Sequence, residues 1–393
     1  MRVLSLALVL VVWSLAACGS AGVVNPPPGA PPGSSVDAGG GGPDGPTSID
    51  PPADFGSLPP SEKITTANPL LSRHRPITSS AGPTTMVDGQ PQPITSLNDG
   101  AIFCCDGFHA PTPSWVAIDL GRGPTRVMVT WLAHGATDQP SHQPIDYHLD
   151  VSPDGNTWTT RATVTGNDVN AREDAIDFTG QQFMRLSVTK AEGDIFELVE
   201  LEAFDIAHGS DDTWMFIGDS ITGMAMSPNR FTELLHKAHP GFTPMMIGAG
   251  IGGTQTTSAL TQIDTWIARF PDVRNFGVGF GTNDSGCDLT GQGVDGYISR
   301  LKIIIDKLKA ANKRVLVPHI PWNEYCNNTP TLLAPYNAAI DNLRAQDPFL
   351  AGPDLYTYFA AHPDQLDPDH VHPNDNGIEA INQQWAAAAA QLY

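Results

Sequence analysis

Phe216-Ile217-Gly218-Asp219-Ser220-Ile221-Thr222-Gly223 is the stretch from which the fold of the C-terminal part of the chain can be worked out. The apolar run at residues 214–217 predicts a short buried strand, and residues 229–239 carry apolar side chains at helical spacing. Ser220 is therefore expected at a turn from strand to helix. Such a turn can expose a hydroxyl at the sheet edge and point backbone N–H groups at an oxyanion. Gly-Asp-Ser alone is just as typical of a plain turn followed by a helix N-cap.

Strands alternate with helices throughout residues 212–393. This alternation predicts a parallel sheet with helices on both faces, an α/β/α three-layer fold with a flavodoxin-like sheet. Loops at the carboxyl ends of such strands form the site, so the Ser220 turn and the loops after the next two strands are expected on one edge. The expected strands are residues 214–217, 243–247, 275–280, 314–319 and 349–352. The expected helices are residues 229–239, 258–268, 294–311, 331–345 and 375–391.

Residues 63–207 have a different texture, with short runs of β-forming residues separated by turn signals such as Asp154-Gly155-Asn156. Many short strands without a long helical pattern predict an antiparallel β-sandwich. The chain is thus expected to hold two folded domains, an N-terminal β-sandwich and a C-terminal α/β domain at residues 212–393. The expected strands are residues 116–120, 126–132, 147–152, 161–165, 175–178, 183–188 and 197–204.

The N-terminal segment has the features of an export signal. Arg2 is followed by an apolar run at residues 3–15 and by the sequence Leu15-Ala16-Ala17-Cys18. This order resembles a bacterial lipoprotein signal of residues 1–18, in which the chain is cut before Cys18 and that cysteine carries lipid; an ordinary secretory signal with a free thiol is the alternative. Residues 19–62 are rich in Pro and Gly and predict a disordered linker. The resemblance implies an exported protein of the cell envelope or surface, anchored to the membrane only through lipid on Cys18.

The charge composition of the chain limits which kinds of partner it can attract. The chain has 42 acidic side chains against 21 basic ones, a net charge of −21, which argues against nucleic acid or an anionic membrane as a charge-driven partner. Beyond Cys18, four cysteines remain, an even number for an oxidising compartment. A bridge between Cys287 and Cys326 is one candidate. The adjacent pair Cys104 and Cys105 allows either a vicinal disulfide or two thiols, and the connectivity stays open.

Four blocks of the C-terminal domain together resemble the four blocks of the SGNH or GDSL hydrolases. Each block follows a strand or precedes the last helix, as that family requires. One departure is Gly248, where many relatives carry Asn two residues before the oxyanion glycine. The blocks are Gly218-Asp219-Ser220, Gly250 with Gly252-Gly253-Thr254, Gly281-Thr282-Asn283-Asp284, and Asp369-His370-Val371-His372-Pro373-Asn374.

The resemblance implies a serine esterase mechanism. Ser220 would be the nucleophile, His372 the general base and then general acid, and Asp369 the residue that orients the imidazole. The N–H groups of Ser220 and Gly250 and the side-chain amide of Asn283 would form the oxyanion hole. No metal or organic cofactor is required for such chemistry.

The last block contains two overlapping pairs at the same spacing. Asp367 and His370 repeat the spacing of Asp369 and His372. The second pair is preferred because His372-Pro373-Asn374 directly precedes a helix. Asp219 and Asp284 are typical of the family, and both are expected to cap turns and nearby backbone amides.

The β-rich segment resembles the discoidin or coagulation-factor C-type domain, which has a galactose-binding-like jelly-roll fold. The resemblance implies a carbohydrate-binding-like module, in which Trp115, Trp131 and Trp158 are structural. It also implies a possible structural Ca²⁺ near Asn98, Asp99 and Glu200, although a turn and a hydrogen-bonded glutamate explain the same residues. The stretches that carry the resemblance are residues 115–121, 147–158, 183–186 and 200–204. Candidate sugar-platform residues on the rim are Phe103, Phe108, His109 and His134.

The leading hypothesis is therefore an extracellular serine esterase that removes acyl groups, with acetyl expected, from a carbohydrate or other glycan. The block residues support an ester hydrolase, and the export signal and neighbouring module support a glycan substrate. A second hypothesis is a lipase, lysophospholipase or thioesterase with a purely structural β-domain. A third is a catalytically silent, lectin-like surface protein.

Overall fold

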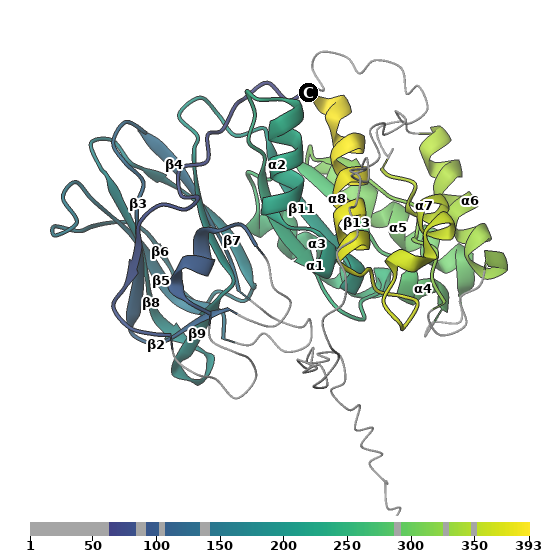
Figure 1. Ribbon diagram of the computed structural model, residues 1–393, viewed down its shortest axis with the longest axis horizontal. Coiled ribbons are helices and arrows are strands. Elements are labelled where there is room, and N and C mark those ends of the chain that lie inside the picture. The colour runs from purple at the N-terminus through teal and green to yellow at the C-terminus, as the bar shows by residue number, and fades with distance from the viewer. Residues whose placement is uncertain are drawn as a thin grey trace, which may run out of the picture. The chain divides into compact units, whose positions relative to one another are not determined.

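The computed structural model describes residues 63–83, 92–101, 107–133, 142–286, 292–324, 330–346 and 352–393. All of these residues belong to one compact unit that spans Asp50–Tyr393. Antiparallel strands fill the first part of this unit, and strands alternating with helices fill the second (Figure 1). The change from one pattern to the other lies between Asp205, where the last antiparallel strand ends, and Thr213, where the first parallel strand begins.

The first part contains an antiparallel sheet in the order β1-β3-β8-β5-β6, another in the order β10-β4-β7, and a pair β2-β9. One hydrophobic cluster joins buried residues from all three sheets. An antiparallel β-domain is therefore present, and its jelly-roll order stays a prediction. The strands are β1 (Ile77–Ser79), β2 (Phe108–Pro111), β3 (Ser114–Asp119), β4 (Arg126–Leu132), β5 (Pro144–Ser152), β6 (Thr159–Val164), β7 (Ala171–Asp177), β8 (Phe183–Ala191), β9 (Ile195–Leu198) and β10 (Glu200–Asp205).

The second part is built on a parallel sheet in the order β12-β11-β13-β14. The central strand β11 is buried along its whole length, so its side chains alternate between two apolar layers. Met215 and Ile217 pack into one cluster, and Trp214 and Phe216 into the other. The strands are β11 (Thr213–Gly218), β12 (Met245–Gly250), β13 (Asn275–Gly279) and β14 (Arg314–Leu316).

Helices cover both faces of this sheet, which confirms the expected three layers. Buried residues of α3, α5 and α6 pack on the face that holds Met215, and those of α1, α2, α7 and α8 pack on the face that holds Trp214. A short helix, α4, follows β13. The helices are α1 (Ser220–Ala225), α2 (Pro228–Ala238), α3 (Thr256–Arg269), α4 (Thr282–Gly286), α5 (Gly293–Ala310), α6 (Pro330–Gln346), α7 (Leu355–Ala361) and α8 (Asp375–Ala389).

Several short elements differ from the sequence-based expectation. The single strand expected at residues 197–204 is two strands, β9 and β10, which pair in different sheets. Strands β1 and β2 and helices α1, α4 and α7 were not expected. The longest of these has seven residues, and helices this short depend on tertiary contacts rather than on an apolar repeat. Most of the strand expected at residues 349–352 lies outside the described residues.

Several contacts join the segment expected to form the β-sandwich to the α/β part. Ile64 donates its N–H to the carbonyl of Leu392 at 2.7 Å and joins the hydrophobic cluster around Trp214. Glu173 of β7 accepts the N–H groups of Asp272 and Val273 at 3.1 and 3.0 Å. Ile64, at the start of the segment expected to form the β-sandwich, and Glu173, within that segment, thus both contact the α/β part.

Helices long and apolar enough to cross a bilayer are not found in the described ranges of the chain.

Candidate active site

Ser220 lies directly after the central strand β11 and is the first residue of α1. Asp219 is the N-cap of that helix, and its side chain accepts the N–H of Ile221 at 3.1 Å. The sequence expectation of a serine at a strand-to-helix turn is confirmed. The helix N-cap that the Gly-Asp-Ser sequence also predicted is present, and Asp219 is the capping residue. Ser220 follows it and is partly exposed.

Three side chains from the first and last blocks form a hydrogen-bonded chain. Ser220 Oγ lies 2.9 Å from His372 Nε2, and His372 Nδ1 lies 2.6 Å from Asp369 Oδ2. Asp369 Oδ1 also accepts the N–H groups of Val371 and His372 at 2.9 and 3.0 Å, which fixes the carboxylate within its own loop. The structure therefore brings together all three residues expected to carry the chemistry.

The charge of Asp369 decides the tautomer of His372. Partial burial raises the pKa of Asp369, but the hydrogen bonds from the His372 ring and from two backbone N–H groups outweigh it and lower that pKa below its usual value. An ionised carboxylate can only accept, so His372 Nδ1 must carry a proton. Nε2 of the neutral ring is then free to accept the hydroxyl proton of Ser220.

The second candidate pair does not contact Ser220 in this way. His370 points its Nδ1 toward Glu324 at 3.8 Å, and its own N–H donates to the carbonyl of Asp367 at 2.8 Å. Asp367 donates its N–H to the carbonyl of His372 at 2.7 Å. This pair closes the loop that presents His372, as a neighbour rather than as part of the hydrogen-bonded chain.

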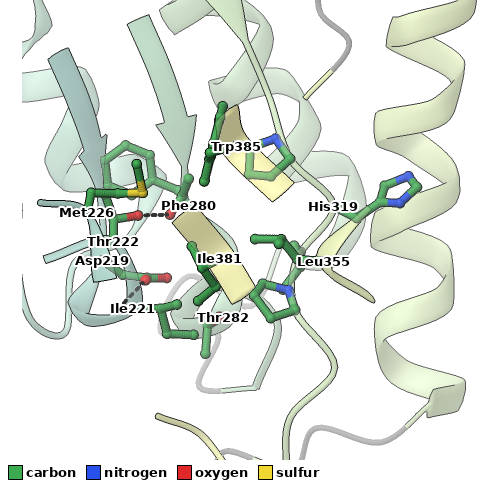
Figure 2. Close-up of a pocket in the computed structure, with 14 residues that line it drawn as sticks. Asp219, Ile221, Thr222, Met226, Phe280, Thr282, His319, Leu355, Ile381 and Trp385 are labelled. Atoms are coloured by element: carbon green, nitrogen blue, oxygen red, sulfur yellow. Dashed lines mark hydrogen bonds between the residues drawn. The ribbon is translucent and has the colours of Figure 1, made fainter. Parts of the chain in front are cut away.

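An apolar pocket lies behind the serine turn, and Figure 2 shows Asp219 at its edge with Met226, Ile381 and Trp385. Ser220 and His372 are not among the residues that line it. Burial raises the pKa of Asp219 to about 7, against the hydrogen bond from Ile221, and the charge of Asp284 raises it further. The buried carboxyl group of Asp219, next to Ser220 in the chain, thus has a pKa near neutral pH.

The side chain of Asn283 lies in α4, after strand β13, and is tied to the loop that follows β12. Its Nδ2 donates to the carbonyl of Thr254 at 3.0 Å, and Gln255 Nε2 donates to the carbonyl of Asn283 at 2.7 Å. Thr254 is itself anchored to the end of β11, because its Oγ1 donates to the carbonyl of Gly218 at 3.1 Å. The three loops expected on one sheet edge are therefore joined by hydrogen bonds.

The glycines after β12 have two different reasons to be glycine. Gly250 ends the strand, and a Cβ there would collide with the backbone of Thr222 and Gly223 in α1. Gly253 has a φ of +72° and open space around it. Neither Gly252 nor Gly253 donates its N–H to a partner within the described ranges. Close packing accounts for the glycine at position 250, and the positive φ accounts for the glycine at position 253.

The expected sugar platform needs a correction. Phe108 and His109 lie in β2, which pairs with β9, and neither has any exposed surface. They therefore cannot form a rim platform. Phe103 and His134 lie outside the described residues. Trp131 is a core residue, as expected, whereas Trp115 and Trp158 are only half-buried and flank the guanidinium of Arg185.

The residues expected near a structural Ca²⁺ are engaged with protein groups. Glu200 accepts the N–H of Gly100 at 2.9 Å, Asp99 accepts the N–H of Ala101 at 2.7 Å, and Asn98 donates to two carbonyls. The guanidinium of Arg73 lies against Gly100 and pairs with Glu202 at 2.5 Å. No group of three or more potential His, Cys, Asp or Glu ligands occurs among the residues described. Arg73 supplies a positive charge near these residues, and a calcium ion at Asn98, Asp99 and Glu200 stays a prediction.

Five cysteines and the N-terminal segments lie outside the described residues. Cys18, the expected signal at residues 1–18 and the expected linker at residues 19–62 belong to this group. Cys104, Cys105, Cys287 and Cys326 do as well.

Comparison with known proteins concerns mainly the α/β part. Residues 216–380 match the model of the GDSL-like Lipase/Acylhydrolase family. No curated protein matches the sequence. The chain is similar to the solved lipase/acylhydrolase from Enterococcus faecalis at 19% identity, covering 45% of this chain and 95% of that one, with a TM-score of 0.40.

Two other solved structures are each similar to a portion of the chain. A variant of the acetyl xylan esterase Axe2 from Geobacillus stearothermophilus has 17% identity, covers 47% of this chain and 95% of its own, and has a TM-score of 0.40. CpGH89CBM32-5 from Clostridium perfringens, solved with GalNAc-β-1,3-galactose, has 17% identity, covers 34% of this chain and 99% of its own, and has a TM-score of 0.28. The family match covers the Ser220 turn and the Asn283 loop, together with the loop that carries His372. The α/β part of this chain therefore matches the GDSL-like Lipase/Acylhydrolase family, and the protein is an ester hydrolase.

Proposed function

We propose that this protein is an extracellular serine esterase that removes acyl groups, with acetyl expected, from a carbohydrate or glycan. The hydrogen-bonded chain from Ser220 through His372 to Asp369 is the observation that carries the proposal. It supplies a nucleophile, a base and a group that orients the base, which are the parts that acyl transfer from an ester requires.

Acylation follows from this geometry. Ser220 Oγ attacks the ester carbonyl while His372 Nε2 takes the hydroxyl proton, and Asp369 stabilises the resulting imidazolium. The tetrahedral intermediate collapses when His372 returns the proton to the leaving alcohol. A water molecule then attacks the acyl-enzyme by the same route in reverse, which releases the acid and restores the hydroxyl. The reaction needs no metal or organic cofactor.

The oxyanion needs donors on the side of Ser220 away from His372. The N–H of Ser220 and the second amide hydrogen of Asn283 are two of them, because one hydrogen of that amide is used by Thr254. Gly250 was the expected third donor. We favour Gly253, because it precedes Thr254, which Asn283 contacts, and because its N–H has no partner among the described residues.

The proposal of a glycan substrate is based on the N-terminal half of the sequence. We propose that the β-domain is a galactose-binding-like module that holds a polymer near the catalytic domain and raises its local concentration. We also propose that the chain is an exported lipoprotein anchored through Cys18. The acidic net charge of −21 favours a neutral or basic glycan over a polyanion.

Two measurements test the proposal. Hydrolysis of nitrophenyl esters of increasing acyl length should be fastest for acetyl, and acetate should be released from at least one member of a panel of acetylated polysaccharides. A preference for long acyl chains without acetate release would favour a lipase, lysophospholipase or thioesterase.

Retention on polysaccharide separates binding from catalysis. The Ser220→Ala variant should lose turnover and still be retained on the polysaccharide that the wild type deacetylates. Retention of a wild-type protein that hydrolyses neither short nor long esters would instead favour a silent, lectin-like protein.

A further inference from the structure

A buried arginine outside the four sequence blocks is connected to the oxyanion side of the site. Arg300 lies in α5, and its residue is only 8% exposed. Its Nε donates to Thr256 Oγ1 at 2.8 Å, and its Nη2 donates to Asp284 Oδ1 at 3.3 Å. Arg300 therefore contacts the first residue of α3 and the residue that follows Asn283 at the same time.

Thr256 and Asp284 complete this network. Thr256 donates its hydroxyl to Asp284 Oδ1 at 2.5 Å and its N–H to the same carboxylate at 3.1 Å. Both side chains are buried. Burial raises the pKa of Asp284, whereas the hydrogen bonds from Thr256 and the charge of Arg300 oppose this rise. The guanidinium thus helps to keep a buried carboxylate ionised between the two loops.

The same two loops are joined a second time through Asn283. Asn283 Nδ2 donates to the carbonyl of Thr254, and Gln255 Nε2 donates back to the carbonyl of Asn283. Residues 254–256 are therefore paired with residues 283 and 284 by hydrogen bonds in both directions. A shift of Asp284 relative to Thr256 would move the Asn283 amide and the Gly252–Gly253 turn relative to Ser220.

We propose that Arg300 is a positioning residue that sets the oxyanion hole through Asp284 and Thr256. The proposal rests on the proposed oxyanion role of Asn283. Arg300 touches neither substrate nor reacting atoms. Its guanidinium is planar and contacts Thr256, Asp284 and Gln292 at fixed angles, which a lysine ammonium cannot reproduce. Oxyanion donors stabilise the transition state only when they are held at the right place. A small displacement of the donors therefore lowers kcat more than it weakens substrate binding.

Thr256→Val and Arg300→Lys test this proposal in the full-length protein, with nitrophenyl acetate as the substrate. Both variants should lower kcat by about tenfold and leave KM within about twofold, because a small misplacement of the donors weakens mainly the transition state. Asn283→Ala should lower kcat by about 10²–10³-fold. Thr261→Val is the matched control, because Thr261 lies on the same helix, is exposed and bonds only within the helix.

The double variant Thr256→Val/Asn283→Ala distinguishes positioning from general damage. If Thr256 acts through Asn283, adding Thr256→Val to Asn283→Ala should cost less than about twofold in kcat. Equal losses in both backgrounds would overturn the proposal, as would wild-type kcat in Thr256→Val. If Arg300→Lys fails to fold, Thr256→Val and its double variant decide the outcome, because valine keeps the shape of threonine. Wild-type kcat in Asn283→Ala would instead contradict the oxyanion role itself, and the positioning role with it.

Discussion

Ser220 and His372 are separated by 152 positions in the chain, yet Ser220 Oγ lies 2.9 Å from His372 Nε2. The two residues come from opposite ends of the α/β part, one at the end of its central strand β11 and the other just before its last helix α8. Their contact therefore depends on the complete sheet. It also defines which proton transfer the site can support.

Ser220→Ala should remove turnover. The change deletes the nucleophile, and loss of such a residue typically lowers kcat by about 10⁶-fold in a serine hydrolase. The melting temperature should change little, because the Ser220 side chain is partly exposed. Ser299→Ala, an exposed change in α5, is the control. Retention of more than about one hundredth of wild-type kcat in purified Ser220→Ala would contradict the nucleophile assignment.

Asp369→Asn should lower kcat by about 10⁴-fold with little effect on KM, because an amide nitrogen facing His372 Nδ1 favours the wrong tautomer. Asp367→Asn should stay near wild type, since Asp367 contacts the His372 loop through its backbone. Steady-state kinetics on nitrophenyl acetate compares the two. The reverse order of effects would assign the orienting role to the other pair.

Stability should fall as the pH rises from about 5 to about 8. Burial raises the pKa of Asp212 and of Asp219 to about 7 and that of Glu173 to about 8. These pKa values lie above the unfolded values of about 4, so the folded state binds more protons throughout this window and loses stability as they dissociate. Urea unfolding at several pH values measures the change.

At acid pH the free energy of unfolding should change in the opposite direction and rise with pH. Hydrogen bonds to Asp150, Asp354 and Asp369 outweigh the effect of burial and lower their pKa values, so their contribution is lost as the pH falls below about 4. The free energy of unfolding should therefore be greatest near pH 5. Asp219→Asn should flatten the fall above pH 5, and exposed Asp364→Asn should not. A free energy that rises toward pH 8 would refute the assignment of these buried carboxyls.

A structure of Ser220 modified by a phosphonate should identify the oxyanion donors. The phosphonyl oxygen mimics the oxyanion and should lie about 3 Å from Ser220 N and from Asn283 Nδ2. The third donor should be Gly253 N. An oxygen bound to Gly250 N, with the Gly252–Gly253 turn directed away, would restore the original expectation from sequence.

The parts of the fold that could be predicted are those with a long repeating pattern. β11 and the helices α2, α3, α5, α6 and α8 follow from buried runs and helical spacing, and the Ser220 turn follows from its place between them. The contact between Ser220, His372 and Asp369 was expected from the order of the blocks. The preference for His372 over His370 came from its place just before the last helix, because the two pairs have identical spacing.

Other features could not be predicted because they depend on what lies across the fold. Phe108 and His109 follow turn-like residues and gave no strand pattern, but pairing of β2 with β9 buries them completely. Arg300 belongs to an amphipathic helix and gave no sign that its partners are Thr256 and Asp284, 44 and 16 positions earlier. Likewise, a glycine at 250 shows that a side chain is not tolerated, but not that α1 is the obstacle.

The contact between Ile64 and Leu392 limits where this enzyme can be truncated. A catalytic fragment beginning at residue 212 would uncover the apolar surface around Trp214 that Ile64 occupies, and the carbonyl of Leu392 would lose its partner. Fusion proteins and chimeras that borrow the esterase should therefore carry residues 63–66 along, which means the preceding β-domain as well. In recombination terms, the junction near residue 210 is not a clean breakpoint, and the two halves are expected to be inherited and exchanged as a pair.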